Sequence, residues 1–141
     1  MPAPSTSAPL CDSAAGSGSQ RRFVRCSPGT TREVFLVGRW AIKIPQYRWE
    51  WRHFLLGLLA NMQERHWWRN FPRPELCPVL WGTPGGWLIV MRRAEPMTRD
   101  QFDEIDLEAW CDRGDWKVPA EPKMDSFGWI DGRLVAVDYG N

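Results

Sequence analysis

Short runs of strand-forming residues, separated by turn residues, constrain the fold of this chain more than any other feature. Three runs lie at 23–26, 33–37 and 40–44, and the two connections between them are short and rich in Gly, Pro and Thr. Connections of this kind join neighbouring antiparallel strands. Two further runs, at 79–81 and 87–91, flank a turn rich in glycine. The sequence therefore predicts a five-stranded antiparallel sheet.

One long helix is predicted between the third and fourth strands. From Tyr47 to about Arg69, large apolar residues recur at the three- and four-residue spacing of a helical stripe, and polar residues gather on the other side. The stripe consists of Trp51, Leu55, Leu58, Leu59 and Met62. Gly57 in the middle costs about 1 kcal/mol relative to alanine, or it implies close packing at that point.

A second helix is predicted after the sheet. Residues 92–96 leave the fifth strand as a connector. Thr98 with Gln101 then matches the capping box that begins a helix, which we expect to reach about Trp110. Residues 112–122 mix acids, bases and prolines without a period, so they predict a loop.

The chain closes with a predicted β-hairpin that has an acid at its exit. A turn at 131–132 leads to an apolar strand at 134–137 and then to Asp138-Tyr139-Gly140. A carboxylate in this position often presents a hard cation to a polyphosphate, although solvated loop acids share the pattern. Asp125 and Asp138 could face one another near Lys123, as a metal-phosphate site requires. The elements together predict an α+β fold.

Length and charge limit the classes of function. The 141 residues can bury one sizeable core, which predicts a single domain at 21–141. Residues 1–20 are mostly Ser, Ala, Pro and Gly, and this composition predicts a flexible tail. The 18 Lys and Arg nearly balance the 17 Asp and Glu, so no global field favours nucleic acid or an anionic membrane. The ten tryptophans are expected mostly in packing or at interfaces.

Cysteine spacing and hydropathy indicate a cytoplasmic protein. Cys11, Cys26, Cys77 and Cys111 show neither a CxxC pair nor a Cys/His ligand spacing, so we expect reduced thiols rather than a zinc site or a disulfide scaffold. The N-terminus lacks the charged start and apolar run of a signal peptide, and no window is apolar enough for a membrane span.

In this order, the elements resemble the protein-kinase-like superfamily, including its small-molecule phosphotransferase branch. Ala41-Ile42-Lys43 resembles the end of the VAIK strand, the helix from Tyr47 resembles helix αC, and Asp138-Tyr139-Gly140 is similar to DFG. Residues 87–96 resemble the fifth strand and the hinge, and 121–126 lie where the HRDxKxxN loop would be. The resemblance implies a small-lobe part at 21–91 and a hinge with a truncated large lobe at 92–141, together a reduced kinase-like fold.

The resemblance also implies a nucleotide site that holds ATP and Mg²⁺. Lys43 would hold the α- and β-phosphates and pair with a helix carboxylate, which we take to be Glu50, with Glu64 as the alternative. Asp138 would bind Mg²⁺. Met91 would stand at the gatekeeper position, and the backbone of the hinge would meet the adenine. The hinge residues are Arg92, Arg93 and Ala94.

The catalytic loop departs from the pattern of that superfamily. Glu121 replaces the family aspartate as the catalytic residue, no histidine precedes it, and Lys123 matches the family lysine. Ser126 stands where an asparagine would bind a second metal ion, although Asp125 could supply an oxygen ligand instead. The first turn, at 27–31, lacks the GxGxxG pattern.

Three functional hypotheses follow. The first is a pseudokinase that acts by binding a partner protein, because the helices of the larger lobe are expected to be missing after Asn141. The alternative is an active small Mg-ATP-dependent phosphotransferase with Glu121 as base. The third is a single-strand nucleic-acid binder that uses Trp67-Trp68-Arg69 and Arg48-Trp49, which the balanced charge disfavours. A compact gene of this kind also resembles one that a bacteriophage carries into the cytoplasm of its host.

Overall fold

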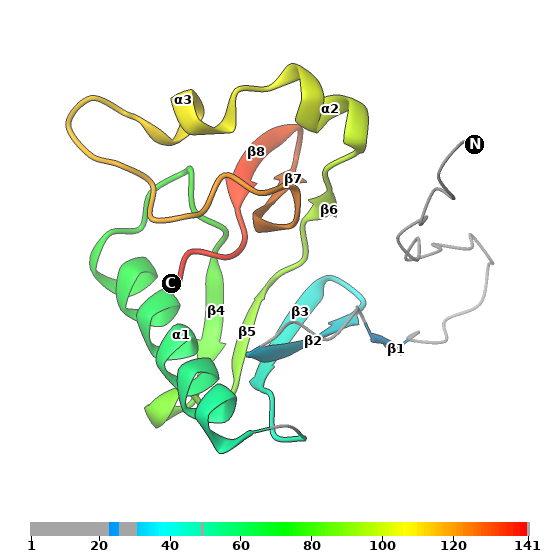
Figure 1. Cartoon of the computed structure of the whole chain (residues 1–141), viewed down its shortest axis with the longest axis vertical. Coiled ribbons are helices and arrows are strands. Elements are labelled where there is room, and N and C mark those ends of the chain that lie inside the picture. The colour runs from blue at the N-terminus through cyan, green and yellow to red at the C-terminus, as the bar shows by residue number, and fades with distance from the viewer. Residues whose placement is uncertain (1–22, 26–30, 49, 141) are drawn as a thin grey trace.

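The described part of the chain forms two antiparallel sheets, with the long helix packed beside the larger one (Figure 1). The structure is a computed structural model that describes residues 23–25, 31–48 and 50–140, with side chains from residue 31 onward. The predicted tail, most of the first turn, Cys11, Cys26 and Trp49 lie outside the described residues.

The predicted five-stranded antiparallel sheet is confirmed, with the strand order β1-β2-β3-β5-β4. Its strands are β1 (Phe23–Arg25), β2 (Arg32–Val37), β3 (Trp40–Pro45), β4 (Val79–Gly82) and β5 (Ile89–Arg92). β5 begins two residues later than predicted, because the turn before it contains a short 3₁₀ helix, η1 (Pro84–Gly86). Thr83 closes this turn, since its Oγ1 accepts a hydrogen bond of 3.0 Å from the backbone N–H of Leu88.

The long helix, α1 (Trp51–Asn70), does not pack against the sheet with its apolar stripe. The opposite face of the helix meets the sheet instead. Its buried residues are Gly57, Ala60, Asn61 and Glu64, whereas Trp51, Leu55, Leu59 and Met62 are exposed. Gly57 explains the choice of face: a Cβ there would lie 2.3 Å from the carbonyl oxygen of Thr31 and 2.9 Å from the Cα of Pro45. Only a helix face of small residues can approach the sheet this closely.

This close approach predicts that Gly57→Ala destabilises the protein. Alanine gains about 1 kcal/mol in helix propensity, but overpacking against two backbone segments costs about 1–3 kcal/mol, and we expect the second effect to dominate. Urea denaturation measures the difference. Arg52→Ala, at an exposed position of α1, is the matched control and should stay within about 0.5 kcal/mol of the wild type. A stabilised Gly57→Ala variant would show that the contact is not tight.

The predicted terminal hairpin is confirmed and gains a third strand from the connector. β7 (Phe127–Ile130) and β8 (Arg133–Ala136) form the hairpin, and β6 (Glu95–Pro96) pairs with β7. Gly128 permits this pairing, because a Cβ there would lie 2.8 Å from the carbonyl oxygen of Glu95. The connector therefore holds the smaller sheet against the end of β5.

The predicted second helix is two short helices. α2 (Arg99–Glu104) begins with the expected capping box of Thr98 and Gln101. The helix breaks at Ile105, and Asp106 caps α3 (Leu107–Cys111) by accepting a hydrogen bond of 3.1 Å from the N–H of Ala109. The break turns Leu107 and Cys111 into the core. A further 3₁₀ turn, η2 (Met124–Ser126), precedes β7.

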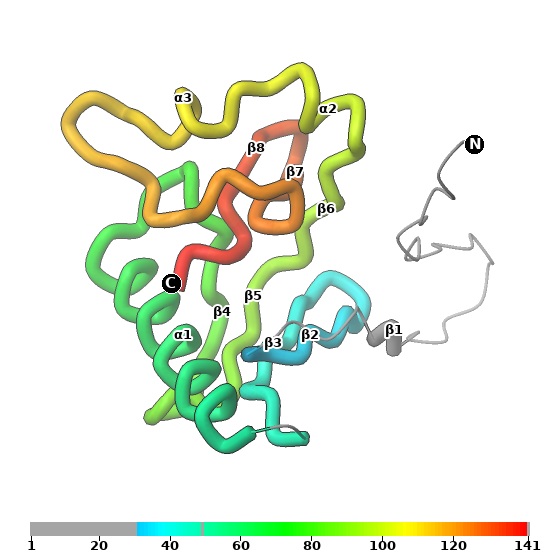
Figure 2. The backbone as a smooth tube through the Cα atoms, in the orientation of Figure 1, coloured from blue at the N-terminus to red at the C-terminus, as the bar shows by residue number. Residues whose placement is uncertain are grey.

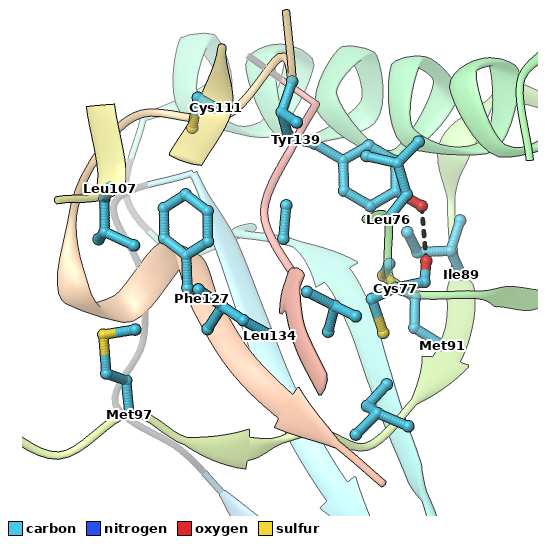
Figure 3. Close-up of a cluster of buried hydrophobic side chains, with 14 residues drawn as sticks. Leu76, Cys77, Ile89, Met91, Met97, Leu107, Cys111, Phe127, Leu134 and Tyr139 are labelled. Atoms are coloured by element: carbon cyan, nitrogen blue, oxygen red, sulfur yellow. Dashed lines mark hydrogen bonds between the residues drawn. The ribbon is translucent and has the colours of Figure 1, made fainter. Parts of the chain in front are cut away.

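The hydrophobic core lies between the smaller sheet, β5 and α3 (Figure 3). The segment that follows α1 is tied to β8, since Cys77 donates a 2.9 Å backbone hydrogen bond to Ala136. Tyr139 anchors the end of the chain, because its buried hydroxyl donates a hydrogen bond of 2.8 Å to the carbonyl of Cys77. The last described residue, Gly140, returns to α1, where a Cβ would lie 2.3 Å from the carbonyl oxygen of Ala60 (Figure 2).

The tryptophans divide into a packing group and an exposed group. The packing group lies partly buried against the core and consists of Trp67, Trp68, Trp110, Trp116 and Trp129. The exposed group consists of Trp40, Trp51, Trp81 and Trp87. None of the tryptophans whose side chains the structure describes is fully buried, so they contribute less to the core than expected. Within the described residues, no helix has the length and hydropathy of a membrane span.

Candidate functional site

A cluster of four charged side chains joins both halves of the chain. Arg32 begins β2, Lys43 lies on β3, Glu64 lies on the inner face of α1, and Asp138 follows β8. Arg32, Lys43 and Glu64 are 7%, 5% and 0% exposed, whereas the side chain of Asp138 is 35% exposed. We call these four residues the charged cluster. Its two cations and two carboxylates balance one another.

Glu64 is the central acceptor of the charged cluster. Arg32 contacts it with both ends of its guanidinium, Nη1 at 2.9 Å from Oε2 and Nη2 at 3.0 Å from Oε1. The Nζ of Lys43 donates to the same two oxygens at 3.0 and 3.1 Å, and the backbone N–H of Tyr139 donates to Oε1 at 3.2 Å. The two parallel contacts between Arg32 and Glu64 form a bidentate ion pair, which is the strongest geometry in which arginine binds a carboxylate.

Arg32 extends the charged cluster to Asp138. One guanidinium nitrogen donates to Oδ1 of Asp138, and the other donates to Oδ1 of Asn61 at 3.2 Å. Asn61 in turn donates to the carbonyls of Lys43 and Gly86, at 3.3 and 2.9 Å. Lys43 also donates to the carbonyl of Val137. The cluster therefore fixes the backbone of β3, η1 and the C-terminal segment around α1.

Burial and the charges of neighbouring members shift the pKa values of Arg32, Lys43 and Asp138. Burial opposes the charge of Arg32, but Glu64 and Asp138 outweigh burial and raise its pKa above the ordinary value. Burial would likewise raise the pKa of Asp138, but Lys43 and Arg32 outweigh it and hold that pKa below the ordinary value. Burial lowers the pKa of Lys43, against the attraction of Glu64.

The lowered pKa of Asp138 predicts a specific acid sensitivity. The ionised carboxylate stabilises the folded state above its unfolded pKa of about 3.9, and this contribution is lost as the pH falls through the lower folded-state pKa. The unfolding free energy of the wild type should fall as the pH is lowered from neutral to acidic. We expect this fall to be smaller in Asp138→Asn, as measured by urea denaturation. Asp131→Asn, at a side chain 77% exposed, is the matched control and should leave the loss unchanged. An unchanged loss in Asp138→Asn would contradict the role of the ion pair.

The structure brings Lys43 and Asp138 into one cluster, as the sequence predicted, but it corrects the partner of Lys43. Glu50 does not pair with Lys43, because it is the exposed N-cap of α1 and lies at the end of the helix away from the cluster. The alternative, Glu64, makes the ion pair with Lys43 at 3.0 Å. The buried face of α1 carries Glu64 into the cluster together with Asn61.

The predicted adenine-binding segment is already engaged in backbone hydrogen bonds. The N–H of Arg92 donates to the carbonyl of Pro78 at 3.1 Å, and the N–H of Arg93 donates to that of Arg39 at 2.9 Å. The side chain of Arg92 pairs with Asp131 at 2.9 Å, in an exposed position. Met91, predicted as gatekeeper, is buried in the core, and Ala94 is half-buried before β6.

Glu121, Lys123 and Asp125 of the predicted catalytic loop lie at the surface. Lys123 forms an ion pair with Glu121, and both side chains are more than half exposed. The hydrogen bond to Glu121 raises the pKa of Lys123, and the charges of Asp125 and Asp138 add to this effect. Ser126 is buried, and its backbone carbonyl accepts a hydrogen bond of 2.8 Å from the N–H of Val137. Ser126 therefore ties the predicted catalytic loop to the backbone segment that carries Asp138.

The arrangement of acids does not fit a magnesium-nucleotide complex. Asp138 is occupied by the guanidinium of Arg32, and Asp125 is exposed in η2. Across residues 31–48 and 50–140, no three or more His, Cys, Asp and Glu side chains gather in a group that could hold a metal ion. Cys77 and Cys111 are free and buried, and burial raises the pKa of the Cys77 thiol to about 12.

Comparison with known proteins supports the fold. No protein-family model matches the sequence, and no curated protein matches it. Among solved structures, the chain is similar to PpkA-294 in its apo form, a fragment of a bacterial Ser/Thr kinase, with a TM-score of 0.55 and 18% identity. The similarity covers 92% of this chain and 62% of the PpkA-294 chain. The chain therefore has an α+β architecture compatible with a reduced kinase-like fold, as predicted.

Two members of the site were not found from the sequence. The sequence pattern singled out neither Arg32, which directly precedes the predicted strand at 33–37, nor Asn61 in the predicted helix. The spacing of Gly57, Ala60, Asn61 and Glu64 contains the missing signal, because small residues at three- and four-residue intervals mark the face of closest packing. Glu64 and Asn61 lie on that face.

Proposed function

We propose that this kinase-like chain acts by binding another protein and that phosphoryl transfer is lost. The observation that carries the proposal is the contact between Arg32 and Asp138. Asp138 is the residue that the resemblance to kinases assigns to Mg²⁺, and here an internal guanidinium already balances its charge. A divalent cation would have to displace a buried arginine that also holds Glu64 at 2.9 Å.

Two further observations support the loss of catalysis. The hinge donors of Arg92 and Arg93 are used within the protein, which leaves fewer groups to recognise an adenine ring. Glu121, at the position of the catalytic aspartate, is paired with Lys123 at the surface. A general base must lie within hydrogen-bond reach of the proton that it removes, and an exposed ion pair does not hold it in place.

The alternative of an active Mg-ATP-dependent phosphotransferase has one observation in its favour. Lys43 and Glu64 form the buried ion pair that the resemblance to kinases requires. The hypothesis of a single-strand nucleic-acid binder has less support, because Trp67 and Trp68 are partly buried against the core, which leaves less of their rings for stacking on bases. The test below therefore compares protein binding with nucleotide chemistry.

We expect Mg-ATP at millimolar concentration to leave the melting temperature of the wild type unchanged. A ligand at 100 times its dissociation constant would add about 2.7 kcal/mol of stability, so binding would be visible by differential scanning fluorimetry. Arg32→Gln removes the cation that competes with Mg²⁺ for Asp138. In this variant, we expect Mg-ATP to raise the melting temperature, which it does not do in the wild type. Lys43→Met serves as the control that abolishes any shift due to phosphate binding.

Protein binding is tested by affinity capture from the native host, followed by measurement of the molar ratio of captured protein to this chain. One partner in a fixed ratio, together with the absence of ATP turnover, is the expected result. A monomer that captures no partner and hydrolyses or transfers the γ-phosphate of Mg-ATP would overturn the proposal in favour of the phosphotransferase.

A further inference from the structure

We draw no further inference here: the strongest candidate, the exposed apolar face of α1 around Trp51, Leu55 and Leu59, carries none, because charges of both signs lie at its start and nothing in the described part of the chain shows what covers it.

Discussion

Glu64→Ala is expected to destabilise the protein by about 3–5 kcal/mol, since it leaves the buried charges of Arg32 and Lys43 without their shared acceptor. The loss comes less from the missing contacts than from desolvation of the two cations, which are 7% and 5% exposed and cannot reach water. Equilibrium denaturation in urea at neutral pH measures the change. It is among the largest effects that a single substitution on α1 can have.

Glu50→Ala is the matched control, because it removes the other carboxylate that the sequence offers to Lys43. Glu50 is exposed and its side chain makes no capping hydrogen bond, so we expect a change within about 0.5 kcal/mol. A second control replaces Arg32, Lys43 and Glu64 by Met, Met and Leu together with Asp138→Asn, so that no member of the charged cluster keeps an unpaired charge. Buried ion networks replaced by apolar residues of similar volume are often neutral or stabilising, so this variant should recover much of the loss. A Glu64→Ala protein within about 1 kcal/mol of the wild type would show that the cluster is solvated.

Tyr139→Ala is expected to cost about 3–5 kcal/mol, the range for removing a large buried side chain. Tyr139 is 0% exposed, and it packs with Leu76 and Cys77 where the C-terminal segment meets α1 (Figure 3). The substitution removes the packing that holds Asp138 beside Arg32. We therefore expect a weaker acid response of stability in this variant as well as a lower unfolding free energy.

Tyr139→Phe separates packing from hydrogen bonding in the same side chain. It keeps the ring and removes only the donor to the carbonyl of Cys77, so we expect a smaller cost of about 1–3 kcal/mol. Tyr47→Ala, at a tyrosine 62% exposed, should change stability by less than about 0.5 kcal/mol. Equal losses in Tyr139→Phe and Tyr139→Ala would mean that the ring contributes nothing to the core.

The sequence predicted the elements well because each has a local cause. Alternating apolar residues and short turns defined the five strands of the larger sheet, and the capping box of Thr98 and Gln101 located the start of α2. The break between α2 and α3 was missed, because it depends on how Leu107 and Cys111 meet the core. The third strand of the smaller sheet was missed for a similar reason: β6 has two residues and forms only because Gly128 lets it approach.

The orientation of α1 could not be derived from its period alone. A stripe at Trp51, Leu55 and Leu59 indicates a helix, but the period does not say which side meets the sheet. Gly57 decides this, since the backbone at Thr31 leaves no space for a Cβ. The choice between Glu50 and Glu64 as partner of Lys43 depends on position along the helix, because residues fourteen apart lie near the same face but about 21 Å apart along the axis.

Some contacts of the charged cluster join residues that are near in the sequence, and others join residues far apart, so they can form at different times during folding. Glu64 meets Lys43 and Arg32 at separations of 21 and 32 residues, whereas Arg32 meets Asp138 at a separation of 106. Loop closure is less costly in entropy for the shorter separations. During synthesis, the first half of the chain can therefore satisfy its buried cations before the C-terminal residues emerge. Arrival of Asp138 and Tyr139 then completes the network.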